Sequence, residues 1–159
     1  AGIEAVVVHD VASADGEVIE DTFDWFAQDV DGNVWYLGED TAEYENGEVT
    51  SRAGSWEHGV DGAYGGIVMP AEPTTGLAQR QEFYLGEAED MGEVIKLDGV
   101  ATTPLGDYKE LLVVKEWSPL EPDVVEHKYY ARGIGLVLAE KVQGGSGGEA
   151  PVEYEAGTT

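Results

Sequence analysis

Along the chain, short segments rich in apolar and aromatic residues are separated by dipeptides that are typical of turns. Three of these dipeptides, Asp15-Gly16, Asp31-Gly32 and Asn46-Gly47, lie between runs rich in Val, Trp, Tyr and Phe. Such pairs readily adopt the positive φ angles of a two-residue hairpin turn. The pattern therefore predicts three successive hairpins in a four-stranded antiparallel meander, with strands at about 3–12, 17–29, 33–44 and 48–57.

Strand-like segments continue along the rest of the chain, at 67–69, 79–90, 92–101, 108–118, 123–132 and 135–142. No window of useful length keeps apolar residues at helical spacing. We therefore expect an all-β fold, an antiparallel meander that closes into a barrel or a strongly curved half-barrel sheet with a concave face. Residues 1–143 are expected to form one β domain. Residues 144–159 are expected to be a Gly-rich linker and flexible acidic tail, or else to include a weakly docked strand.

Charge narrows the range of functions. The 159 residues include 33 acidic and 8 basic side chains, a net charge of -25, and residues 1–95 contain only Arg52 and Arg80 as basic side chains. This charge excludes sequence-independent binding to nucleic acid or to an anionic membrane. The absence of cysteine excludes disulfides and thiolate metal sites. The acidic side chains either form a solvated, self-repelling surface or converge on a hard cation such as Ca²⁺, which takes oxygen ligands.

Two groups of acidic residues are candidates for a calcium site. Asp29 and Asp31 open an Asp-x-Asp-Gly-Asn segment that resembles the start of a calcium loop, although a type I′ hairpin turn explains the same residues and the flanking strands exclude an EF-hand. The second group lies on two similar segments, Trp35–Asp40 and Phe83–Asp90, and consists of Glu39, Asp40, Glu87, Glu89 and Asp90. The alternative for this second group is a sheet edge protected by charge.

Aromatic residues are candidates for a ligand groove. Alternation in the second strand places Phe23, Trp25 and Ala27 on one face and a polar and aromatic mixture, typical of a ligand-facing surface, on the other. The candidate ligand-binding residues are Trp25, Trp35, Tyr36 and Tyr84, for which the alternative is a place in the core. The three histidines, His9, His58 and His127, have no spacing that indicates a metal site.

Our leading hypothesis is a non-enzymatic binding protein for Ca²⁺ or a small molecule, with no transmembrane segment. The rival hypothesis is an acid/base enzyme that uses a pair of carboxylates on a small ring-shaped or carbohydrate substrate. That enzyme would require Glu82, Glu87 or Glu126 to be buried, with a raised pKa, beside an aromatic cleft. The sequence names no catalytic residue, because it has no nucleophile elbow, phosphate loop or dinucleotide motif.

Six stretches of the chain carry a family resemblance: Asp21–Asp29, Gly32–Tyr36, Gly59–Ala63, Met69–Ala71, Gln81–Asp90 and Glu126–Val137. They resemble stretches of an uncharacterised group of bacterial secreted or lipid-anchored β proteins of unknown function. The resemblance implies a curved antiparallel sheet and an extracytoplasmic protein, but no activity. A chain that begins at Ala1 rather than Met fits either a processed mature protein or an artificially shortened chain.

Overall fold

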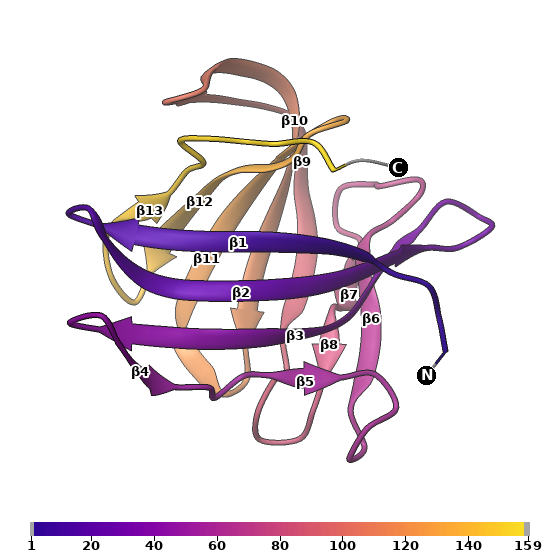
Figure 1. Ribbon diagram of the computed structural model, residues 1–159. Coiled ribbons are helices and arrows are strands. Elements are labelled where there is room, and N and C mark those ends of the chain that lie inside the picture. Colours follow the sequence, from indigo (N-terminus) through magenta and orange to yellow (C-terminus); the bar gives the residue numbers. More distant parts are fainter. Residues whose placement is uncertain (1, 158–159) are drawn as a thin grey trace. The chain divides into compact units, whose positions relative to one another are not determined.

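The computed structural model describes residues 2–157, and in that part of the chain it contains strands, turns and loops but no helix (Figure 1). The prediction of an all-β fold with antiparallel sheets is therefore confirmed. The strands are β1 (Val6–Ala14), β2 (Glu17–Gln28), β3 (Val34–Glu45), β4 (Glu48–Ser51), β5 (Trp56–Glu57), β6 (Tyr64–Met69), β7 (Ala78–Arg80), β8 (Glu82–Phe83), β9 (Met91–Thr103), β10 (Gly106–Ser118), β11 (Glu121–Ala131), β12 (Gly135–Gln143) and β13 (Gly148–Glu149).

The described residues form two compact units. Unit 1 consists of residues 2–72, 79–91 and 118–120, and unit 2 of residues 73–78, 92–117 and 121–157. The first sheet has the strand order β1-β2-β3-β6-β8, with β4 and β5 also paired to β3. The second sheet has the order β13-β12-β11-β10-β9-β7.

Neither sheet closes on itself within residues 2–157, so the predicted barrel or strongly curved half-barrel is not observed. The predicted strand at 79–90 is replaced by the short β7 and β8 and by a turn from Tyr84 to Ala88. Before them, Pro70 and Pro73 interrupt the meander, because proline has no N–H to donate to a ladder. Strands of two or three residues then remain at one end of each sheet instead of a long strand that could complete a ring.

Two of the three predicted hairpin turns are confirmed. Asp15 and Gly16 have φ values of 53° and 86°, and Asn46 and Gly47 have 54° and 79°, as a type I′ turn requires. The prediction of a two-residue turn at Asp31-Gly32 is wrong, because β2 and β3 are joined by a longer loop. The backbone N–H of Asp29 donates to the carbonyl of Asn33 at 2.9 Å, which closes a five-residue connection.

The β2–β3 pair gives the first sheet two different faces. Thr22 pairs with Thr41, Asp24 with Glu39 and Phe26 with Tyr36 along one face, while Trp25 pairs with Gly38 on the other. A bulge between Trp25 and Phe26 inserts one extra residue in β3. The predicted division of β2 into a polar and aromatic face and an opposite face is therefore present.

The core of unit 1 contains both similar segments noted in the sequence. Trp56, Ala63 and Ala88 are buried together, and Tyr36 and Tyr84 pack against them. These two tyrosines occupy corresponding positions in Trp35–Asp40 and Phe83–Asp90. The two segments thus contribute the same type of side chain to one core.

Unit 2 has a core of aliphatic side chains from its long strands, including Leu111 of β10 and Val137 of β12. Lys128 of β11 donates to Glu116 of β10 at 2.6 Å, and Tyr130 donates to the same carboxylate at 3.3 Å. Within the predicted tail, β13 pairs with Ala139 and Glu140 of β12. Residues 158–159 of that tail lie outside the described residues.

Candidate functional site

Asp29, a predicted calcium ligand, is a loop-stabilising residue. Its carboxylate accepts hydrogen bonds from the backbone N–H groups of Asp31 and Asn33, from the Asn33 side chain and from the Trp35 indole, at 2.9–3.0 Å. These donors, with the Trp35 indole first, lower the pKa of Asp29 to about 2. Asp31 contributes its backbone N–H to this arrangement. The Asp-x-Asp-Gly-Asn segment is therefore a hydrogen-bonded loop.

The second group of predicted calcium ligands is spread over separate contacts. Asp40 accepts from Arg52 at 2.9 Å, Glu89 accepts from the Gly86 N–H at 2.9 Å, and Glu87 is exposed. Glu39 and Asp90 lie near each other, since Asp90 contributes to the raised pKa of Glu39. In residues 2–157, no three His, Asp or Glu side chains converge in a way that could hold a metal ion. Calcium binding stays a prediction without a geometric site.

A cluster of carboxyl and aromatic side chains, here called the acidic–aromatic cluster, lies on the Asp24 face of the first sheet. It consists of Asp24, Tyr36, Glu39, Trp56 and Glu82. The Tyr36 hydroxyl donates to Asp24 at 2.6 Å, and the Trp56 indole donates to Glu82 at 2.8 Å. The rings of Tyr36 and Trp56 meet edge to face with centroids 5.4 Å apart. The two hydrogen-bonded pairs thus meet through their aromatic rings.

Electrostatic repulsion and burial act together on Glu39. Burial, followed by the negative charge of Asp24, raises the pKa of Glu39 to about 7, and a hydrogen bond with Tyr36 partly opposes this effect. The same two causes, burial and Asp24, raise the pKa of Tyr36 far above its ordinary value. Glu39 is therefore partly protonated near neutral pH, whereas Tyr36 stays a neutral hydrogen-bond donor.

The predicted ligand-binding residues do not form one groove. Tyr36 and Tyr84 pack against the core of unit 1, whereas Trp35 donates to Asp29. Trp25 lies on the opposite face of β2 from Asp24 and lines a pocket. Of the four residues, Trp25 alone lines this pocket.

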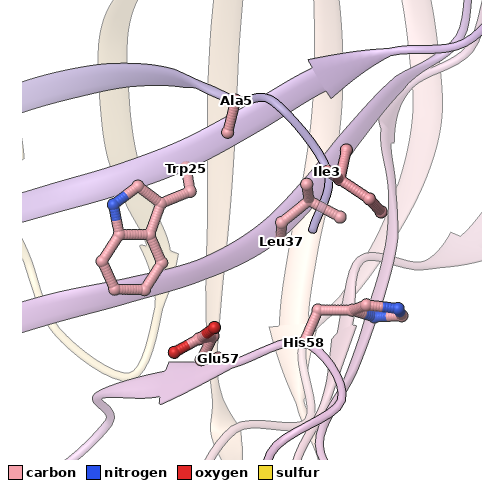
Figure 2. A pocket seen from close by; sticks show the side chains of 6 residues that line it. All are labelled: Ile3, Ala5, Trp25, Leu37, Glu57 and His58. Carbon is pink, nitrogen blue, oxygen red and sulfur yellow. The ribbon is translucent and has the colours of Figure 1, made fainter. Parts of the chain in front are cut away.

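That pocket, here called the Trp25 pocket, has a volume of about 260 Å³ and is shown in Figure 2. Trp25 of β2, Leu37 of β3 and Glu57 of β5 line it, together with Ile3, Ala5 and His58. Figure 2 shows the Glu57 carboxyl group on the side where the Trp25 indole lies, while the His58 ring extends away from that indole. The pocket combines an aromatic wall, aliphatic side chains and a carboxylate.

His58 is held by the strand that follows it. The Gly65 N–H donates to Nδ1 of His58 at 2.9 Å, and the ring packs edge to face against Tyr64. Because Nδ1 accepts this hydrogen bond, the neutral imidazole carries its own hydrogen on Nε2. The ring of His58, one of the residues that line the Trp25 pocket, is thus fixed in orientation with Nε2 as a potential donor.

The residues that the enzyme hypothesis requires differ in their surroundings. Glu82 is only 6% exposed and accepts from Trp56, whereas Glu87 is exposed and Glu126 is half-buried in unit 2.

Sequence reasoning missed the pairing of Asp24 with Glu39, although both positions are equally distant from the Asp31-Gly32 dipeptide. Counting outward from that dipeptide would have placed the two carboxyl groups opposite each other in a hairpin.

Comparisons of the chain with protein-family models, with curated proteins and with solved structures find no match. Among the described residues, no helix has the length and apolar character needed to cross a membrane. Function is therefore inferred from the geometry alone.

Proposed function

We propose that this protein is a non-enzymatic binding protein that takes a small organic cation in the Trp25 pocket. The observation that carries the proposal is the composition of this pocket, in which the Glu57 carboxylate and the Trp25 indole lie around an aliphatic side chain, Leu37. A ligand with an ammonium group on an apolar body matches all three surfaces. The carboxylate complements its charge, and the indole favours a nearby cation through its π face.

The charge distribution supports a cationic ligand. Residues 1–95, which supply every side chain of the pocket, contain 22 acidic residues against Arg52 and Arg80. An acidic surface raises the local concentration of cations and accelerates their association, in a manner that salt weakens. An anionic ligand would meet the opposite effect.

Calorimetric titration with 2-phenylethylamine and with uncharged 2-phenylethanol tests this proposal. We expect the amine to bind at least about tenfold more tightly than the alcohol, since only the amine can pair with a carboxylate. Glu57→Gln should remove most of that preference, and Trp25→Leu should weaken both ligands. Glu48→Gln, which removes an exposed carboxylate in β4, is the matched charge control. Equal affinities for the two probes, or no heat with either, would contradict the proposal.

The acidic–aromatic cluster supports a second candidate, acid/base catalysis on a small ring-shaped or carbohydrate substrate. Glu39, with a pKa of about 7, stands opposite Asp24, so a proton donor and an acceptor coexist near neutral pH. Hydrolysis of a panel of p-nitrophenyl glycosides tests this candidate. Activity that Glu39→Gln abolishes and Glu48→Gln preserves would support it, and a panel without turnover would oppose it.

A further inference from the structure

The turn that joins β3 to β4 places an asparagine and a glycine in open surroundings. Asn46 and Gly47 are both exposed, and a Cβ atom added at Gly47 would meet nothing within 4 Å. Among the described residues, no hydrogen bond holds the side-chain amide of Asn46. This amide is therefore able to change its rotamer without the loss of a contact.

The backbone nitrogen that follows this amide is equally unprotected. Glu45 and Glu48 form the last pair before the turn, and in a two-residue turn the closing hydrogen bonds belong to that pair. In the part of the chain that the structure describes, no turn hydrogen bond involves the N–H of Gly47. Gly47 also has no side chain that could shield its nitrogen.

Asn33, the other asparagine of the chain, is held on both sides of its amide. Its Nδ2 donates to Asp29 at 2.9 Å, and its Oδ1 accepts from the Ala71 N–H at 2.9 Å. The residue after it, Val34, belongs to β3 and has a stiff, branched side chain next to the backbone nitrogen. The two asparagines thus differ in both of the groups that an intramolecular reaction would need.

We propose that Asn46 is a modification site, at which the chain deamidates itself with water as the only co-reactant. The Gly47 backbone nitrogen attacks Cγ of Asn46, so that an N–Cγ bond forms, the Cγ–Nδ2 bond breaks, and ammonia leaves with the former amide hydrogen of Gly47. Water then opens the cyclic imide. Cleavage of the N–Cγ bond gives aspartate, and cleavage of the bond to the main-chain carbonyl carbon gives isoaspartate. No electrons are transferred, and the chain gains one negative charge.

The products disturb the hairpin in which they form. Isoaspartate adds one carbon atom to the main chain, so the turn no longer has the length that a two-residue connection requires. Glu45 and Glu48 already stand directly opposite each other, and both products place a third carboxylate between them. Glu48, Val49 and Thr50 of β4 are exposed, so little burial opposes the change. Deamidation therefore loosens the pairing of β4 with β3.

Incubation of the full chain in native buffer and in concentrated urea, followed by peptide mapping with mass spectrometry, tests the proposal. Urea keeps the effect of the neighbouring residue in the sequence and removes the effect of the fold. We expect the ratio of the Asn46 rate to the Asn33 rate to be at least about tenfold larger in the folded chain. This difference corresponds to only about 1.4 kcal/mol of additional activation free energy at the hydrogen-bonded Asn33. Equal ratios in the two solvents, or an Asn46 that stays unmodified in native buffer, would overturn the proposal.

Two variants and the identity of the product test the chemistry. Asn46→Gly removes the amide but keeps a residue that accepts the φ of 54°, and it should abolish the more acidic species that isoelectric focusing detects. Asn33→Ser is the matched control and should preserve that species. The peptide map should contain isoaspartate, and a product that is aspartate alone would overturn the cyclic intermediate. The Trp25 pocket and its ligand are not involved in these measurements, so this proposal and the proposed function fail independently.

Discussion

Asp24 and Glu39 are direct cross-strand partners, so two carboxyl groups stand opposite each other in the pairing of β2 with β3. Like charges in this position destabilise a sheet. Two features reduce the repulsion between Asp24 and Glu39. The Tyr36 hydroxyl donates to Asp24, and Glu39 is partly protonated at neutral pH. The pair links the stability of unit 1 to pH.

Tyr36→Phe removes the hydrogen bond to Asp24 and should lower the free energy of unfolding by about 1–2 kcal/mol, because a part-buried carboxylate loses a donor. It should also raise the pKa of Glu39, which the Tyr36 hydroxyl lowers. Urea denaturation at several pH values measures both effects. Tyr64→Phe is the control, since Tyr64 is 60% exposed and contacts His58 through its ring. Equal losses in the two variants would show that the Tyr36 hydroxyl has no special role.

Glu39→Gln should flatten the dependence of stability on pH. The pKa of Glu39 is about 7 in the folded chain against 4.5 ordinarily, so the folded state binds more protons than the unfolded state between these values. The free energy of unfolding therefore falls as the pH rises from about 4.5 to about 7, and this loss of stability is complete above pH 7. At pH 8 the variant should be more stable than wild type by on the order of 2 kcal/mol, after allowance for partial exposure.

Urea denaturation between pH 4.5 and pH 8 checks this prediction, with Glu48→Gln as an exposed control. A wild-type stability that rises across this interval while that of Glu39→Gln does the same would contradict it.

Asp29→Ala should disorder the loop between β2 and β3, because four hydrogen bonds depend on this carboxylate. Its lowered pKa, about 2, means that its contribution is present above about pH 4 and is lost as the pH falls toward 2. The variant should therefore melt at a lower temperature near neutral pH and shift the fluorescence of Trp35 to longer wavelength. Asp31→Ala, which keeps the backbone N–H that bonds to Asp29, should leave both readings nearly unchanged.

Gly38→Ala should be strongly destabilising. A Cβ atom at this position would overlap the Trp56 carbonyl oxygen, and the φ of 137° is itself unfavourable for any other residue. We expect a loss of about 3 kcal/mol from strain and overpacking together. Gly47→Ala, at a turn where nothing lies within 4 Å of the added atom, should cost only about 1 kcal/mol. Thermal or urea unfolding of the two variants would measure the difference.

The strands and hairpins could be predicted from the sequence because their signals are local. Asp15-Gly16 and Asn46-Gly47 supply two positive φ angles at adjacent positions, and alternation then sets the faces of β2. The prediction of a two-residue turn at Asp31-Gly32 was wrong because the Asp29 carboxylate offers nearby N–H groups a competing acceptor. The prediction of a barrel was wrong because closure of a sheet depends on which distant strands pair, and no local sequence pattern encodes this pairing.

The candidate sites were predicted only in part. Trp25 was predicted to bind a ligand and lines a pocket, but Leu37 and Glu57 of that pocket come from other strands, and their approach to Trp25 depends on the bulge in β3 and on β5. The acidic residues were expected to gather around an ion. Asp40 instead bonds to Arg52, and Glu89 bonds to a backbone N–H in its own turn.

The Trp56–Glu82 hydrogen bond has a consequence for how the chain acquires its structure during synthesis. The donor and the acceptor are separated by 26 positions, and residues 73–78 between them belong to unit 2. A nascent chain that ends at residue 72 has made every strand from β1 to β6 but has no β8 to pair with β6. The ribosome must therefore deliver part of the second unit before the first can be finished, and folding of the two is coupled in time by the order of the chain.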